Sequence, residues 1–296
     1  MQTLLSGQLL FAALVTGAAY ALVALGLNLV YGTMRLLNVA HGEIVMLGAY
    51  VTFWLFSVLA VPPPLALLAS TAAAALLGAA VYHGLLRRML ASPRLKGRIE
   101  ANSLLLFFGV SIILQNLAAL LFDATPRAYR YLDGVVAVGD VAMTGNRLLL
   151  LAVAATLCIA VAIFLRLSIH GLAIKALIQH REAAAVVGIA IGRVQLASVC
   201  LGFGLAGLAG SLVSMTEQIS PFMGFPFTIA AFVVVILGGL GNLVGGMVAG
   251  LLLGAIETYG VALTSPSLRS VLLYGVFIAV LLLRPQGLLG GARMAR

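Results

Sequence analysis

The sequence predicts an all-α protein, a polytopic transmembrane helical bundle of about 8 to 10 spans, and three observations support this. Hydrophobic residues make up 63% of the 296 residues and charged residues only 8%. The mean hydropathy is +1.18, and apolar runs of about 20 residues recur, the length that crosses a bilayer as a helix. The runs are continuous, whereas a transmembrane β-barrel needs short segments of alternating polarity. We expect residues 1–296 to form one transmembrane domain.

Nine apolar runs, separated by charged or proline-containing connections, predict nine crossings. The first ten residues hold no Lys or Arg, so the basic beginning of a secretory signal peptide is missing and the first span is expected to stay in the mature protein. Three prolines at 62–64 separate the second run from the third, because proline suits a helix start. The predicted spans are about 8–30, 38–60, from the prolines to 86, 102–122, 148–165, 194–215, 222–241, 242–260 and 268–283.

The distribution of charge predicts which connections face the cytoplasm. Residues 87–98 hold five cations and no acid, and residues 166–193 hold four cations and one acid, whereas 123–147 holds three aspartates and three arginines. Cytoplasmic loops carry an excess of Lys and Arg. We therefore expect the N-terminus outside, the C-terminus inside, and 123–147 outside. On this assignment all but four of the 17 cations face the cytoplasm; the four are Arg127, Arg130, Arg147 and Arg269.

Several other classes of function are disfavoured by the residues. The net charge is +9, and the cations that produce it lie between the apolar runs. They form no basic face and are not interleaved with aromatic residues, so nucleic-acid binding is not indicated. Cys158 and Cys200 lie in apolar runs, so we expect them to be packing residues that form neither a disulfide nor a metal site. The four histidines, at 41, 83, 170 and 180, have no metal-ligand spacing. We expect no metal, no cofactor and no enzymatic activity.

Polar residues concentrate in one stretch of the apolar region between residues 9 and 61. A charge at the centre of a spanning helix costs about 2.5–3.5 kcal/mol on insertion scales, so these residues need a compensating role. Glu43 has two interpretations: it lies near the cytoplasmic surface in the first turn of a helix capped by Asn38, or it lines a transport route. His41 is either a packing residue or part of the same route. Glu257, Gln115, Asn116 and Asn28 are expected to form hydrogen bonds between helices.

A short internal sequence similarity extends the candidate route to the second half of the chain. The segments Asn38-Val-Ala-His-Gly42 and Asn242-Leu-Val-Gly-Gly246 share an asparagine and a glycine four residues later. Interrupted, glycine-rich segments at corresponding places in two halves are typical of transporter repeats. The sequence therefore predicts a pseudo-repeat with interrupted helices. The candidate substrate-pathway residues are Asn38, His41, Gly42, Glu43, Asn242 and Gly246.

The predicted cytoplasmic segment 166–193 contains a short helix within residues 180–189. Glu182 falls in its first turn, alanines follow, and Gly188 is expected to end it. A narrow helix of this kind is either a connector on the membrane surface or an element that inserts into a groove on a soluble partner. The candidate coupling residues are Arg181, Glu182, Ala183, Ala184 and Gly188.

Three motifs together resemble a known family. Residues 182–188, EAAAVVG, are similar to the core of the cytoplasmic loop by which ABC import permeases contact their ATPases, although the usual Leu-Pro continuation is absent. Residues 27–50, LNLVYGTMRLLNVAHGEIVMLGAY, resemble the signature of branched-chain amino-acid ABC permeases, the smaller of the two in each pair. The resemblance continues through LGGLGNLVGG at 237–246 to LRPQGL at 283–288.

The resemblance implies a subunit of a larger machine in the inner membrane of a prokaryote. Its partners would be a second related permease, two cytoplasmic ABC ATPases that bind ATP, and an extracytoplasmic binding protein for leucine, isoleucine and valine. The chain holds no Gly-x-x-x-x-Gly-Lys-Ser/Thr loop. A permease for urea or short amides has a similar stretch and stays open as an alternative. An ion-driven secondary transporter using Glu43 and Glu257 is a further one.

Overall fold

The computed structural model describes the chain apart from residues 1–5, 93–94, 96, 140, 284–286 and 288–296. It confirms the predicted all-α bundle. Eight of the nine predicted runs are helices or helix runs long and apolar enough to cross a membrane, and the run predicted at 222–241 is a shorter helix, α11. The helices are α1 (Gly7–Met34), α2 (His41–Leu59), α3 (Pro63–Val81), α4 (Arg87–Ala91), α6 (Ile99–Phe122), α7 (Gly145–Leu167), α8 (Ile169–Gln179), α9 (Arg181–Val186), α10 (Ile191–Val213), α11 (Gly224–Gly238), α12 (Leu243–Leu263) and α13 (Arg269–Leu283).

Two shorter elements connect these helices. A π-helical turn, Tyr82–Leu86, joins α3 to α4, so the third span runs on to Ala91. A 3₁₀ turn, Pro266–Leu268, precedes α13. Most of the terminal 283–288 motif, the tail cations Arg284, Arg293 and Arg296, and Arg94 and Lys96 lie outside the described residues.

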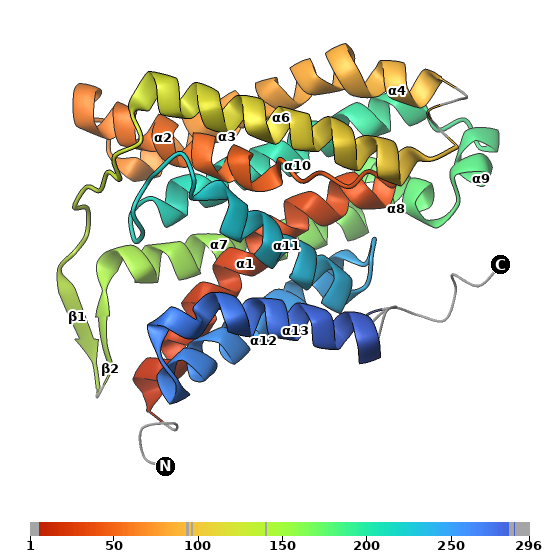
Figure 1. The fold of residues 1–296 in the computed structure, drawn as a ribbon. Helices are drawn as coiled ribbons and strands as arrows, with labels where there is room; N and C mark the ends of the chain where they lie inside the picture. The colour runs from red at the N-terminus through yellow and green to blue at the C-terminus, as the bar shows by residue number, and fades with distance from the viewer. Residues whose placement is uncertain (1–5, 93–94, 96, 140, 284–286, 288–296) are drawn as a thin grey trace.

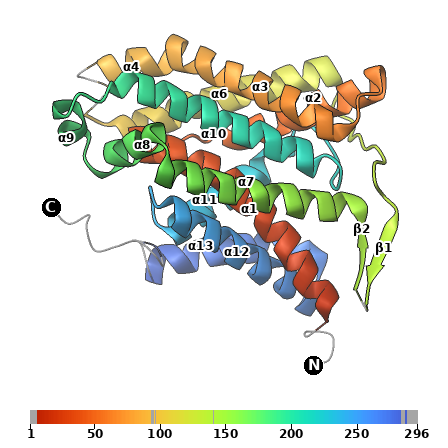
Figure 2. The same ribbon diagram turned by 180° about the vertical axis from the view of Figure 1, so that it is seen from behind.

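The bundle has two distinct ends. At one end, strands β1 (Val135–Val138) and β2 (Val141–Thr144) form an antiparallel hairpin, and α1 begins beside it. At the other end lie α4, α8 and α9 (Figures 1 and 2). We call these the hairpin end and the α9 end. The segments predicted to face opposite sides of a membrane, 123–147 and 166–193, therefore lie at opposite ends of the molecule.

The core lies between α1, α2 and α10, and small residues allow these helices to pack closely. A Cβ on Gly202 of α10 would lie 2.6 Å from the Gly26 carbonyl oxygen of α1, and one on Gly207 would meet α3 at Ser70 O, 2.8 Å away. Close approach of this kind is what small residues at helical spacing provide in membrane bundles. By contrast, α6, α7 and α13 are mostly exposed on the outside of the bundle.

The segment between α6 and α7 is tied to the hairpin end by specific contacts. Arg127 pairs with Ile219 in an isolated antiparallel bridge. The Tyr129 hydroxyl lies 2.8 Å from Ser214 Oγ. Burial raises the pKa of Tyr129 to about 12, so this hydroxyl stays protonated near neutral pH. The sequence predicted this segment only as a connection, and the hairpin within it was missed.

Candidate functional site

The predicted pathway residues of the first half lie at the beginning of α2, in the middle of the bundle. His41 Nε2 donates a hydrogen bond to the Val23 carbonyl halfway along α1, at 2.9 Å. Ser111, halfway along α6, donates to Glu43 Oε1 at 3.2 Å. Of the two interpretations of Glu43, these contacts do not support the one that places it near a surface. The linker before α2 returns from the end of α1 toward the bundle centre, because α1 ends at Arg35 in a left-handed conformation (φ 58°).

The expectation that Asn38 caps α2 is wrong. The helix begins at His41, its N-cap is Ala40, and no side chain caps it. Asn38 offers only its backbone carbonyl, which accepts from His41 N at 3.3 Å. Among the described residues, both Asn38 amide atoms, His41 Nδ1 and Glu43 Oε2 are buried and find no hydrogen-bond partner. Such a concentration of unsatisfied polar atoms is uncommon in a packed interior.

Helix α11 also begins inside the bundle, where it meets the start of α2. Thr228 Oγ1 accepts from Gly42 N (2.9 Å) and donates to the Val39 carbonyl (3.1 Å). A Cβ on Gly42 would overlap the Gly224 carbonyl oxygen. With 15 residues, α11 is about 22 Å long and shorter than the ~30 Å hydrocarbon core. Two helices therefore begin at the same depth, as in the interrupted helices of transporters.

The second-half candidates, Asn242 and Gly246, lie nearer the α9 end and contact a different partner. Asn28 Nδ2 donates to the Asn242 carbonyl and Asn28 Oδ1 accepts from Gly241 N, both at 2.8 Å. Asn242 caps α12 by accepting from Gly245 N at 3.0 Å, and Gly246 faces Asn28. Because Asn242 is a helix cap and Asn38 is not, the two similar segments have different local geometry. The structure does not bring the two sets of candidates together in one cluster.

The five candidate coupling residues form a well-defined protrusion at the α9 end. His180 Nδ1 accepts from Ala183 N at 3.1 Å and caps α9. At the other end of the helix, Gly188 N donates to Ala185 O and Ile189 N to Ala184 O, which is a Schellman motif with Gly188 at φ 84°. The predicted short helix and its end at Gly188 are confirmed.

The surface of this protrusion is exposed and, apart from Arg181 and Glu182, apolar. Val186 and Val187 are 87% and 74% exposed, and Glu182, Ala183 and Ala185 are also exposed, while Ala184 packs inward. A Cβ on Gly188 would meet no atom within 4 Å. Gly188 is therefore favoured by its backbone conformation and not by lack of space.

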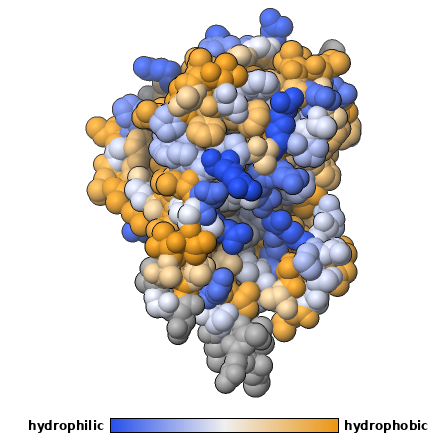
Figure 3. Space-filling view, turned by 90° about the vertical axis from the view of Figure 1, so that its left-hand side faces the viewer, coloured by the Kyte–Doolittle hydropathy of each residue, from blue (hydrophilic) through white to orange (hydrophobic). Residues whose placement is uncertain are grey.

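A cavity of about 410 Å³ opens at the hairpin end, in the size range of small-molecule sites. Figure 3 looks onto this end and shows hydrophilic residues gathered around a depression with hydrophobic surroundings. The cavity is lined from α1, α7, α10, α11, α12 and α13 and from the turns beside them. None of the six predicted pathway residues lines it. Its lining includes Phe227, however, and the next residue, Thr228, is the one that contacts the start of α2.

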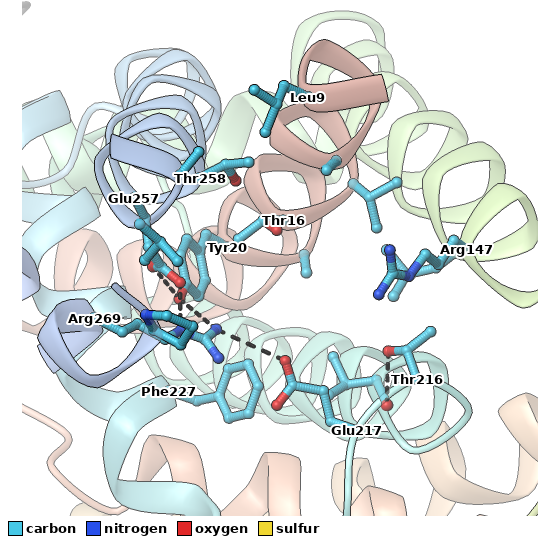
Figure 4. Close-up of a pocket in the computed structure, with 18 residues that line it drawn as sticks. Leu9, Thr16, Tyr20, Arg147, Thr216, Glu217, Phe227, Glu257, Thr258 and Arg269 are labelled. Carbon is cyan, nitrogen blue, oxygen red and sulfur yellow. Dashed lines mark hydrogen bonds and ion pairs between the residues drawn. The ribbon is translucent and has the colours of Figure 1, made fainter. Parts of the chain in front are cut away.

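One wall of the cavity carries a hydrogen-bonded charge network, shown in Figure 4. Arg269 Nε donates to Glu257 Oε1 at 2.5 Å, and the Tyr20 hydroxyl donates to Glu257 Oε2 at 2.6 Å. Arg269 Nη2 lies 3.3 Å from the Tyr20 hydroxyl and 3.7 Å from Glu217 Oε1. Glu257 has both oxygens engaged and its side chain is only 5% exposed. The network fixes Glu257 and leaves Glu217, at 45% side-chain exposure, loosely held.

Sequence reasoning missed this cavity, although one signal pointed to it. An ionisable residue inside an apolar run, such as Glu257, predicts a partner, and Arg269 at the start of the next run was the nearest cation. The sequence offered no way to choose Tyr20, which is 237 residues away. The expectation of bonds between helices is confirmed for Glu257 and Asn28. For Asn116 it is wrong, because its amide donates to Ile112 O of the same helix.

Comparison with known proteins gives matches over nearly the whole chain. The family model described as branched-chain amino acid transport system / permease component matches residues 9–281. The high-affinity branched-chain amino acid transport system permease protein BraD of Pseudomonas aeruginosa is 32% identical over 288 residues, covering 94% of this chain and 93% of its own length. LivH of Escherichia coli K12, a permease protein of the same description, is 31% identical over 293 residues, covering 96% and 95%.

An archaeal relative extends the comparison. The probable branched-chain amino acid transport permease protein LivH of Methanocaldococcus jannaschii is 28% identical over 289 residues, covering 91% of this chain and 88% of its own. No solved structure matches the chain. These homologues are transport permeases, a class that is not enzymatic. Together with the eight membrane-length apolar helices in the described part of the chain, they identify the chain as a multi-pass membrane protein.

Proposed function

Because this chain belongs to the family of permease components of branched-chain amino acid transport systems, we propose that it is the membrane-spanning permease subunit of an ATP-driven importer. The match of the family model over residues 9–281 is the observation that carries this proposal. In the working complex the chain pairs with a second related permease, two cytoplasmic ABC ATPases and an extracytoplasmic binding protein. The transported substrates are leucine, isoleucine and valine, and ATP is bound by the ATPases.

The α9 protrusion is the coupling element of this proposal. Arg181, Glu182, Ala183, Ala184 and Gly188 form or end a short helix with an exposed apolar surface, which suits a groove on a soluble partner. The short α8 and the bundle helix α10 flank it in the chain. Movement of an ATPase against α9 is thereby passed directly to a helix of the core.

The substrate route leads from the cavity at the hairpin end through the junction of α2 and α11. Phe227 lines the cavity, and beyond it lie Thr228, Gly42 and the unsatisfied polar atoms of Asn38, His41 and Glu43. Asn242 and Gly246 follow toward the α9 end. In this conformation the junction is closed, since Gly42 and Gly224 are in contact. Alternating access requires that α2 and α11 separate there.

Reconstitution tests this function. The chain, its permease partner and the ATPases are placed in vesicles, the binding protein is added outside, and uptake of leucine, isoleucine, valine and urea is measured. We expect uptake of the three amino acids only with ATP inside, and no loss when ion gradients are collapsed. Uptake without the ATPases, or uptake that follows the ion gradient, would overturn the proposal. Uptake of urea in place of the amino acids would show that the substrate is urea or a short amide and not a branched-chain amino acid.

Substitutions in α9 test the coupling. Gly188→Val places a β-branched residue at φ 84°, and Glu182→Lys reverses the charge at the start of the helix. We expect both variants to reach the membrane and to lose most leucine uptake, with ATP hydrolysis no longer linked to transport. Gly139→Val is the matched control, because Gly139 also has positive φ (61°) and open space but lies in the hairpin. Normal coupled transport by both α9 variants would contradict the assignment.

A further inference from the structure

The cavity at the hairpin end combines both signs of charge with an apolar wall. Two guanidinium groups, Arg147 and Arg269, and two carboxylates, Glu217 and Glu257, line it and balance one another. Apolar lining residues from five helices include Val15, Leu150, Val213, Phe227 and Val261. A cavity of this composition suits a ligand that carries both charges at one end and an aliphatic group at the other.

The four charged groups are not equally available to a ligand. Arg269 is engaged with Glu257, Tyr20 and Glu217, and both Glu257 oxygens are bonded. Within the described part of the chain, the Arg147 guanidinium forms no ion pair. Figure 4 shows Arg147 across the cavity from Arg269, with its guanidinium directed toward the space between them. Among the residues that the structure describes, the one ion pair of Glu217 is its 3.7 Å contact with Arg269.

We propose that this cavity binds a zwitterionic α-amino acid, with Arg147 pairing with the α-carboxylate, Glu217 accepting from the α-ammonium, and the apolar wall receiving an aliphatic side chain. The inference rests on the proposed function and names a substrate-binding position in the permease itself. Arginine is suited to this task because its planar guanidinium forms paired hydrogen bonds with a carboxylate. The Glu257–Arg269–Tyr20 network fixes the opposite wall. An uncharged amide offers neither a carboxylate to Arg147 nor an ammonium group to Glu217.

A cysteine-protection experiment tests the site on the complete complex in nanodiscs, without nucleotide or binding protein. Cys158→Ala and Cys200→Ala remove the native thiols, and Thr258→Cys places a reporter on the cavity lining. The rate at which a water-soluble methanethiosulfonate reagent modifies the reporter is measured against L-leucine concentration. We expect leucine to slow the reaction. The analogues 4-methylpentanoate and 3-methylbutylamine, which lack one charge each, should need at least about 10-fold higher concentrations.

Variants of the charged residues provide the second arm. Arg147→Gln and Glu217→Gln should each raise the half-protecting leucine concentration about 10-fold or more, and Arg147→Lys should give a smaller change. Arg130→Gln, an exposed arginine of the same segment that does not line the cavity, should change nothing. No protection by leucine, equal protection by the two analogues, or equal behaviour of Arg147→Gln and Arg130→Gln overturns the site.

The same preparation separates this inference from the proposed function. ATP-driven leucine uptake is measured after the binding protein is added. Intact uptake without protection overturns the site alone and leaves the importer. Protection by leucine with failed uptake of all three branched-chain amino acids supports the site and overturns the importer.

Discussion

At the scale of single residues, Asn28 shows how one buried amide can organise two helix ends. Its Nδ2 donates to the Asn242 carbonyl and its Oδ1 accepts from Gly241 N, so it satisfies both a donor and an acceptor of the turn between α11 and α12. Asn28 itself is fully buried. Its removal would leave the partly buried Gly241 N–H without its acceptor, while the Asn242 carbonyl would keep the bond from Gly246 N. An unpaired donor of this kind costs more than the bond itself contributes.

Substitution of Asn28 therefore should destabilise the bundle. We expect Asn28→Ala to lower the free energy of unfolding by about 1–3 kcal/mol. The thermal unfolding of the purified complex in nanodiscs measures the effect. Asn116→Ala is the matched control, because the Asn116 amide is exposed and bonds only within its own helix, and its effect should stay within about 0.5 kcal/mol. Equal effects of the two substitutions would show that the Asn28 contacts are not needed.

At the scale of helices, the sequence predicted where apolar runs lie but not the depth at which each begins. One of the two interpretations of Glu43 placed it near a surface in a helix capped by Asn38, yet α2 begins at His41 in the bundle centre. An apolar residue suits the lipid, the interior of the bundle and any depth of the membrane equally well. Apolar composition therefore does not predict the depth at which a helix begins. Tertiary contacts, here Thr228 with Gly42 and Ser111 with Glu43, decide the position.

The contact between α2 and α11 should depend on the glycine at position 42. A Cβ there would overlap the Gly224 carbonyl oxygen, so Gly42→Ala forces two backbones apart and should cost about 1–3 kcal/mol or more. Gly109→Ala on α6 is the control, since a Cβ there meets no atom within 4 Å and alanine favours a helix by up to about 1 kcal/mol. The two variants are compared by thermal unfolding and by the amount of complex recovered. A Gly42→Ala protein as stable as Gly109→Ala would contradict the close packing of α2 on α11.

At the scale of the whole molecule, the charge pattern predicted which connecting segments lie at the same end of the bundle. The acid-balanced segment 123–147 and the cation-rich segment 166–193 lie at opposite ends of the bundle, as the pattern requires. The cavity was not predictable, because its charged residues come from separate helices and from the turn after α10, and only the folded bundle brings Arg147, Glu217 and Arg269 together. The hairpin was missed because its two strands are only four residues long and lie in a segment that was assigned from its charges alone.

The orientation of the two ends relative to the membrane follows from the positive-inside rule and is open to direct measurement. We expect the α9 end to face the cytoplasm, since the cation-rich segments gather there. Val187→Cys at the α9 end and Val136→Cys in the hairpin are both exposed, at 74% and 45%, and are placed in the Cys158→Ala, Cys200→Ala background. A membrane-impermeant maleimide should label Val136→Cys in intact cells and Val187→Cys only after permeabilisation.

The cysteine-free parent should stay unlabelled, and both variants should react once the membrane is opened, which shows that each thiol is accessible in the folded protein. Labelling of Val187→Cys in intact cells would place α9 on the outer face. The ATPases that the proposed importer requires are cytoplasmic, so an α9 on the outer face could not contact them. The orientation measurement therefore decides whether α9 is in a position to couple ATP hydrolysis to transport at all.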